Sequence, residues 1–151
     1  MAAATLKRAW AYDLSTDILY ELLKLRVEVF VVEQHCAYPE LDGRDLATET
    51  RHFWLEEDGE VIATLRLLEE HSDGPKLFRL TRLCTRADRR DRGHTTRLLQ
   101  AALAEVGNTP CHVNAQLYLV DLYTQHGFTV DGEQFDMDGT PLIPMRRESG
   151  Y

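Results

Sequence analysis

The chain has 151 residues and a mass of 17.4 kDa, a length that suits one domain and leaves too little chain for two. Its composition, 44% hydrophobic and 28% charged, is that of an ordinary globular protein, and its net charge of −8 argues against nucleic acid or an anionic membrane as partner. No stretch approaches the ~20 apolar residues of a membrane helix, and residues 1–7 lack the basic and apolar regions of a leader peptide. We therefore predict a single cytoplasmic domain over residues 1–151.

The first third of the chain predicts a strand, a helix and a long loop. Leu6 to Tyr12 has the pattern of a strand, and Ser15 or Thr16 can cap a helix of about four turns. From His35 to Thr50 the sequence is polar and irregular, and loops of this length are often functional. The predicted helix has one apolar face, made of Ile18, Leu22, Leu25, Val29 and Val32.

Three consecutive antiparallel strands are predicted next. Asp58-Gly59 is a strong hairpin signal between the first two strands, and Asp73-Gly74-Pro75 is a turn before the third. The strands themselves are expected at His52 to Glu56, Val61 to Leu68 and Leu77 to Thr85.

The last third mixes helices and strands. Beyond Gly93 the apolar residues follow a helical period that Gly107-Asn108 closes, and Val120 to His126 predicts a short helix. Cys111 to Leu117 is expected to be a strand, and two final strands flank Asp138-Gly139. The fold class is therefore α+β, or mixed α/β, around a sheet of six or seven strands. The apolar residues of the longer helix are Leu99, Ala102, Leu103 and Val106.

The three cysteines, Cys36, Cys84 and Cys111, are widely spaced and form no CxxC pair. An odd count without such a pair signals neither a disulfide framework nor a structural zinc site. We predict buried, reduced thiols and no bound metal.

Charge is distributed very unevenly along the chain. Between Arg79 and Arg97 seven arginines stand against Asp88 and Asp91, a local charge of +5, so the rest of the chain carries −13. Such a run can simply be a solvated basic loop, but this one ends at Gly93, directly before a predicted helix. The free N–H groups of a helix start, together with arginines, make a phosphate site. Neither GxxxxGK[ST] nor GxGxxG is present.

Several segments resemble one known family. Arg90-Asp91-Arg92-Gly93-His94-Thr95 resembles the pyrophosphate loop of the GNAT acetyltransferase superfamily, and residues 123–128 match its Tyr-x-x-x-Gly-Phe element. Residues 25–34, followed by Cys36, Tyr38 and Asp42, and later Asp138-Gly139 with Ile143 and Met145, look like the ElaA-like branch.

The resemblance implies a GNAT-like sheet, flanked by helices, in which a strand at residues 82–85 splays away from a strand at residues 113–117. Acetyl-CoA would lie in the gap as cosubstrate and would bring an anionic pyrophosphate that suits the arginines. The residues implied in its binding are Leu83, Cys84, Thr85, Arg90, Asp91, Arg92, Gly93, His94, Thr95, Thr96 and Asn114.

The implied reaction is the transfer of an acetyl group to a primary amine, of a small molecule or an exposed amino group, by direct attack. Tyr123 stands where the family commonly places the acid that protonates the thiolate. Glu33 is the first candidate for the base and His52 the second, while Gln34 and Gln116 are assigned to the acceptor. Direct attack needs no nucleophilic cysteine.

Two positions depart from the family pattern. Thr95 replaces a Gly or Ala of the phosphate loop, and Leu142 stands where many ElaA-like sequences have His. They motivate an alternative function, a non-catalytic or weakly active acyl-CoA-binding regulatory module.

The partners can be predicted only by class. The acidic residues after Glu33 predict a cationic acceptor. Nucleic acid is not expected, because the arginines form one loop and lack interleaved aromatic residues. A homodimer remains open, since dimers are common in the superfamily.

Overall fold

The computed structural model describes residues 3–71 and 74–148, so Asp73 of the predicted turn lies outside the described residues. Eight strands form one sheet in the order β1-β2-β3-β4-β5-β8-β6, with β7 paired to β8. The strands are β1 (Thr5–Trp10), β2 (Arg51–Glu57), β3 (Glu60–Glu70), β4 (Leu77–Thr85), β5 (Cys111–Gln116), β6 (Thr129–Val130), β7 (Phe135–Met137) and β8 (Thr140–Arg147).

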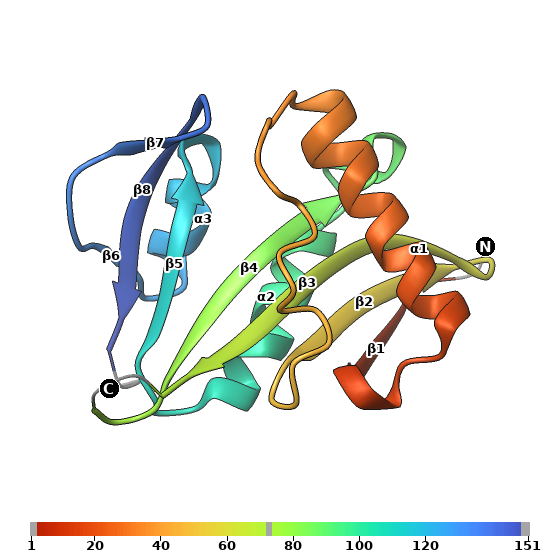
Figure 1. The fold of residues 1–151 in the computed structure, drawn as a ribbon, viewed down its shortest axis with the longest axis horizontal. Helices are drawn as coiled ribbons and strands as arrows, with labels where there is room; N and C mark the ends of the chain where they lie inside the picture. The colour runs from red at the N-terminus through yellow and green to blue at the C-terminus, as the bar shows by residue number, and fades with distance from the viewer. Residues whose placement is uncertain (1–2, 72–73, 149–151) are drawn as a thin grey trace.

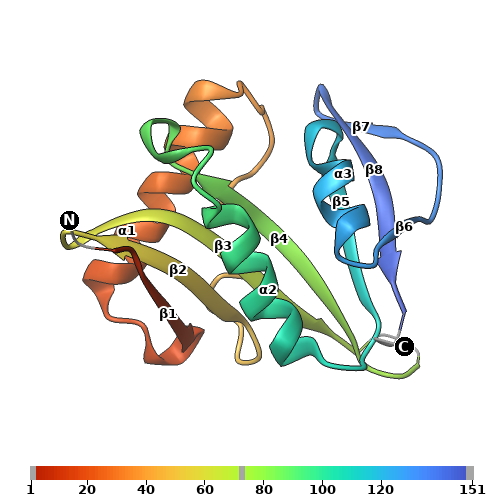
Figure 2. The same ribbon diagram turned by 180° about the vertical axis from the view of Figure 1, so that it is seen from behind.

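Helices cover both faces of the sheet (Figures 1 and 2). One face carries α1 (Thr16–Arg26), its continuation η2 (Val27–Glu33) and the loop that follows; the other carries α2 (His94–Val106) and α3 (Val120–Gln125). The apolar stripe of α2 is buried as its period predicted, and Gly107 ends the helix with a positive φ of 60° and an N–H bond to the Leu103 carbonyl of 3.0 Å. Short 3-10 turns are η1 (Ala11–Asp13), η3 (Ala87–Arg89) and η4 (Leu117–Leu119).

The first helix begins as predicted but ends differently. The Ser15 hydroxyl accepts a hydrogen bond of 3.2 Å from the Ile18 N–H, which makes Ser15 the N-cap. After Arg26 the chain widens into the π-helix η2, in which each turn takes in one extra residue. The extra residue rotates the apolar face, so Phe30 is buried and Val32 is 65% exposed. The prediction that Val32 shares the buried face was therefore wrong.

The sheet has more strands than the six or seven predicted, because β6 is too short to produce a periodic pattern. Its two residues pair with β8 at Arg146 and Met145. Both predicted hairpins are confirmed. Asp58 and Gly59, with φ of 53° and 79°, join β2 to β3, and Asp138-Gly139 joins β7 to β8.

The central parallel pair splays apart, as the family resemblance implied. β4 and β5 pair only at Phe78↔Cys111, Arg79↔His112 and Leu80↔Val113, after which the two strands diverge (Figures 1 and 2). The register between β3 and β4 also shifts: Thr64 pairs with Cys84 and Arg66 with Thr81, so β4 holds an extra residue. Arg82, in this bulge, has a φ of 55°.

Buried ion pairs tie the long loop at residues 34–50 to the sheet. Arg26, only 1% exposed, donates to Glu40 at 2.7 Å and also pairs with Asp45. Arg66, equally buried, bonds both Asp45 and Asp42. Because these carboxylates neutralise arginines inside the protein, the loop is not the acidic surface that the sequence suggested.

All three cysteines are buried and free, as predicted. Burial raises the pKa of the Cys84 thiol to about 12, so this thiol stays protonated and is a poor nucleophile.

Candidate functional site

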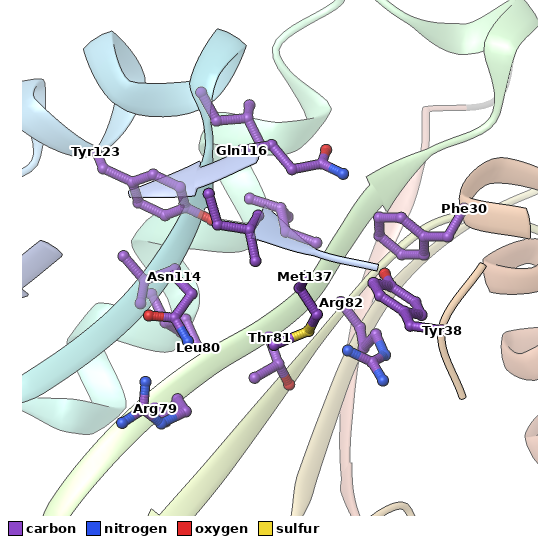
Figure 3. A pocket seen from close by; sticks show the side chains of 14 residues that line it. Phe30, Tyr38, Arg79, Leu80, Thr81, Arg82, Asn114, Gln116, Tyr123 and Met137 are labelled. Atoms are coloured by element: carbon purple, nitrogen blue, oxygen red, sulfur yellow. The ribbon is translucent and has the colours of Figure 1, made fainter. Parts of the chain in front are cut away.

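Two neighbouring cavities occupy the region where β4 and β5 diverge. The first, of about 110 Å³, lies between the two strands and is called the cleft cavity (Figure 3). The second, of about 270 Å³, lies under the arginine-rich loop and the start of α2 and is called the loop cavity. Leu83 and Leu119 line both. A ligand in one cavity can therefore meet a ligand in the other beside Leu83.

The loop cavity brings together most of the predicted cofactor residues. Arg92 does not line it, and Asn114 lines the cleft cavity instead. The predicted residues that do line it are Leu83, Cys84, Thr85, Arg90, Asp91, Gly93, His94, Thr95 and Thr96.

The N-terminus of α2 opens onto the loop cavity without a side-chain cap. Gly93 has a φ of 79°, a left-handed conformation that disfavours any residue with a Cβ. The first hydrogen bond of the helix runs from the Arg97 N–H to the Gly93 carbonyl. The amides of the first turn and the positive end of the helix dipole are the ordinary elements of a phosphate site. His94 beside them has a buried Nε2 atom without a hydrogen-bond partner among the described residues, and desolvation lowers the pKa of this histidine.

The Thr95 side chain turns toward β4. Its hydroxyl lies 3.3 Å from the hydroxyl of Thr85, and both residues line the loop cavity. Whether this branched side chain weakens phosphate binding stays a prediction.

Most arginines of the basic run are neutralised within the chain. Arg86 pairs with Glu60 at 2.7 Å, and Arg89 with Glu57 at 2.9 Å. The +5 counted along the sequence is therefore largely balanced in the folded protein, because acidic residues distant in sequence fold against this stretch. Among the described residues, Arg92 and Arg97 have no carboxylate partner.

Glu33, the first candidate for the base, is engaged by an arginine. Its two carboxylate oxygens accept bonds of 2.5 and 2.7 Å from the Arg90 guanidinium, and these bonds lower the pKa of the carboxyl. Glu33 lines neither cavity. Arg90 also donates through Nε to the Thr85 carbonyl at 3.0 Å. This geometry supports a role for Glu33 as an anchor of Arg90 rather than as a base.

His52, the second candidate, lies away from both cavities. It is 1% exposed, and its Nε2 lies 2.9 Å from the Asp45 carbonyl in the buried network of the long loop. Desolvation lowers the pKa of the imidazole, and the nearby guanidinium groups of Arg26 and Arg66 act in the same direction. This geometry supports a structural role for His52 rather than a catalytic one.

Tyr123, the predicted acid, does line the cleft cavity. The α3 residue is 3% exposed, packs edge-on against Phe128 at a centroid distance of 5.4 Å, and directs its phenol into the cavity (Figure 3). Burial raises the pKa of the phenol above its usual value, so the group holds its proton at neutral pH.

The two predicted acceptor glutamines form a bridge across the divergence. The Gln116 side chain, at the end of β5, donates to Gln34 Oε1 at 2.7 Å, and Gln34 in turn donates to the Tyr118 hydroxyl at 3.4 Å. Gln116 also lines the cleft cavity, where its own Oε1 is buried and has no partner.

Several residues that line the cleft cavity were not predicted from the sequence as site residues. Phe30 arrives through the π-helix, Tyr38 through the long loop, Met137 from β7 and Arg79 from the base of β4. The aromatic Tyr38 in a polar loop was the one local signal that could have been used, since Phe30 depends on the π-helix and Met137 and Arg79 on strand register.

The fold and the two cavities define an acyltransferase class, and the comparisons with known proteins agree. Residues 18–149 match the acetyltransferase (GNAT) domain family. The chain therefore belongs to this family and has the GNAT acyl-CoA N-acyltransferase fold. No helix in the described part of the chain is long and apolar enough to cross a membrane.

Individual relatives confirm the ElaA-like branch. The chain is 65% identical to UPF0039 protein Rv2851c of Mycobacterium tuberculosis over 143 residues, covering 94% of this chain and 92% of that protein. It is similar to the crystal structure of Escherichia coli ElaA with a TM-score of 0.89 and 31% identity, covering 97% and 100% of the two chains. An acyl-CoA N-acyltransferase from Pseudomonas aeruginosa follows with a TM-score of 0.85, 36% identity and coverages of 96% and 99%.

Proposed function

We propose that the protein transfers an acetyl group from acetyl-CoA to a primary amine by direct attack within a ternary complex. The observation that carries the proposal is the meeting of the two cavities at Leu83 and Leu119, with the Tyr123 phenol directed into the cleft cavity.

The loop cavity suits the CoA part of the substrate. The uncapped start of α2 offers amides to a pyrophosphate, and the unpartnered Nε2 of His94 offers a further polar contact. Beyond Leu80 the β4 backbone has no parallel partner strand on the β5 side, so its polar groups there can pair with an extended arm. When bound, acetyl-CoA supplies the thioester carbon that the amine nitrogen attacks as the C–S bond breaks.

The chain's own residues orient the reactants and manage one proton. The Tyr123 hydroxyl is the proposed donor of the proton that the departing thiolate takes up. Among the described residues that line the cleft cavity, none is a carboxylate or a histidine. We therefore propose that the amine attacks in its neutral form without a side-chain base. The proton that its nitrogen sheds as the amide forms passes to water, and water returns a proton to the Tyr123 oxygen.

Thiol release from acetyl-CoA with a panel of primary amines tests the proposal. Tyr123→Phe should lower kcat by about 100-fold, the ordinary scale of general acid catalysis, with little change in the KM for acetyl-CoA. Tyr118→Phe is the matched control, because that phenol belongs to an exposed side chain at the loop cavity. Equal activity of wild type and Tyr123→Phe, or a loss confined to Tyr118→Phe, would contradict the role of Tyr123.

The second candidate, a non-catalytic acyl-CoA-binding module, is favoured by the missing base and by Thr95. It predicts thermal stabilisation by CoA without thiol release, and tighter CoA binding in Thr95→Gly. Turnover of any amine at a rate that depends on Tyr123 would exclude it.

A further inference from the structure

The cleft cavity contains positive charge and no negative charge. Among the fourteen described residues that line it, Arg79 and Arg82 are charged and none is acidic (Figure 3). The carboxylates that balance these arginines stand outside the lining: Glu70 beside Arg79, and Glu40 and Asp42 beside Arg82. A second cationic group on the acceptor would therefore enter a site that already holds two guanidinium ions.

Arg82 is held against the long loop through its Nη2 atom and its ion pairs. Its Nε lies 2.8 Å from Glu40, its Nη2 donates to the Glu40 carbonyl at 3.1 Å, and its guanidinium lies 5.2 Å from the centre of the Tyr38 ring. These contacts fix the Arg82 side chain as part of the cavity wall.

Arg79 is only half engaged. Its Nε donates to both oxygens of Glu70 at 3.1 Å, while its two terminal nitrogens have no acceptor among the described residues. Glu70 also pairs with Arg44 at 3.1 Å, so two guanidinium ions share one carboxylate. The nearby Thr81 hydroxyl accepts a bond of 2.8 Å from Arg66.

Asn114 lies at the same end of the cavity as Arg79, and its side-chain amide likewise has no partner among the described residues (Figure 3). A planar fork with two open N–H groups beside an amide matches a carboxylate, which can accept from both nitrogens of the fork.

We propose that this end of the cleft cavity, formed by Arg79 and Asn114, binds a carboxylate of the acceptor. The inference rests on the proposed function, because the acceptor amine must then reach the Leu83 end. Leu83 is four residues beyond Arg79 on β4, at most about 13 Å along a strand. The acceptor is therefore an extended amino acid whose amine and carboxylate are several bonds apart, in place of the cationic acceptor that the acidic loop suggested.

Acceptors that differ only in charge test the proposal. Thiol release from saturating acetyl-CoA is measured with 4-aminobutyrate and 6-aminohexanoate, and with the primary amide and the alkylamine of the same lengths. For at least one length, kcat/KM for the carboxylate should exceed that for its amide by about tenfold, which corresponds to ~1.4 kcal/mol. In Arg79→Gln this preference should disappear through a raised KM for the carboxylate, and kcat/KM should fall less for the alkylamine than for the carboxylate.

Arg44→Gln is the matched control. It removes the other partner of Glu70 but changes no lining residue of the cavity, so it should keep the carboxylate preference. Arg79→Lys keeps the charge without the fork and should retain part of the preference; it also serves if Arg79→Gln unfolds. Equal kcat/KM for carboxylate and amide, or an equal loss in Arg44→Gln, would overturn the proposal.

Calorimetry separates this inference from the proposed function. If no amine releases thiol, binding of 6-aminohexanoate to the CoA-saturated protein is compared between wild type and Arg79→Gln. Binding that depends on Arg79 would support the carboxylate site while the catalytic proposal fails. Absent binding, or binding that is equal in both proteins, would overturn the site itself.

Discussion

The loop cavity and the cleft cavity are built in different ways from the same chain. The loop cavity takes most of its lining from one continuous stretch, residues 83–96. The cleft cavity takes its lining from a π-helix, a long loop, β4, β5, α3, β7 and β8. A local sequence motif can therefore predict the lining of the loop cavity. The lining of the cleft cavity comes together only when the sheet folds. In the proposed function, the cavity assigned to CoA is therefore mostly local in sequence, and the cavity assigned to the acceptor is distributed.

The cleft cavity depends on distant segments that are held together by buried ion pairs. The largest effect on stability is expected from a substitution of Arg26. Arg26→Met removes one of the two arginine partners of each buried carboxylate, Glu40 and Asp45, and should destabilise the protein by about 3 kcal/mol. Arg86→Met breaks ion pairs with exposed carboxylates and should cost about 1 kcal/mol or less. Denaturant unfolding measures both. Similar losses in the two variants would show that the buried pairs do not hold the wall that contains Tyr38.

The pH dependence of the rate tests the absence of a base in the cleft cavity. If the amine must be neutral and has a pKa near ~10.4, kcat/KM should rise about tenfold per pH unit between pH 6 and 9. The Tyr123 phenol, whose pKa burial raises, stays protonated throughout this range. Glu33→Gln should leave the slope unchanged. A plateau that Glu33→Gln or His52→Gln abolishes would restore one of these residues as the base.

The local construction of the loop cavity can be tested with a matched pair of glycines. Gly93 and Gly59 share a φ of 79° with open space where a Cβ would lie, so alanine at either should cost about 1 kcal/mol of stability through backbone strain. Only Gly93→Ala should also raise the KM for acetyl-CoA, by about three- to tenfold, because Gly93 lines the loop cavity. An equal KM for acetyl-CoA in the two variants would contradict a role of the α2 N-terminus in CoA binding.

The smallest effect concerns acid stability. Burial lowers the pKa of His52, so below about pH 6.5 the folded protein binds fewer protons than the unfolded chain. Stability should then fall with decreasing pH, by at most about 1.4 kcal/mol per pH unit, until the imidazole of the folded protein titrates. His52→Gln should flatten unfolding free energy between pH 6.5 and 5. Asp42 and Asp45, whose pKa values are lowered, contribute stability that is lost only below about pH 4. An unchanged slope in the variant would contradict the structural role of His52.

Much of the fold could be predicted because its signals are local. Ser15 as an N-cap, Gly107 as a helix end and Asp58-Gly59 as a hairpin each act within a few residues. β6 could not be predicted, since its two residues depend on their pairing with β8. The exposure of Val32 likewise depends on the helix widening at Val27, which the apolar pattern does not report.

In the site, too, local features could be predicted and contacts between distant residues could not. The loop residues from Arg90 to Thr96 carry a motif, so most of them could be assigned before the structure was known. The pairing of Glu33 with Arg90 could not be predicted because the two residues lie 57 positions apart in the sequence. The neutralisation of the acidic loop could not be predicted for the same reason, since Glu40 and Asp45 meet Arg26 only in the folded protein.

The π-helix links the two cavities. Val29 contributes to the loop cavity and the next residue, Phe30, to the cleft cavity, so two adjacent positions of one backbone turn line two cavities. Any displacement of this turn must move both walls together. Deleting a single residue between Val27 and Glu33 would restore ordinary α-helical winding and misplace both side chains at once. The length of this segment is therefore constrained by both cavities.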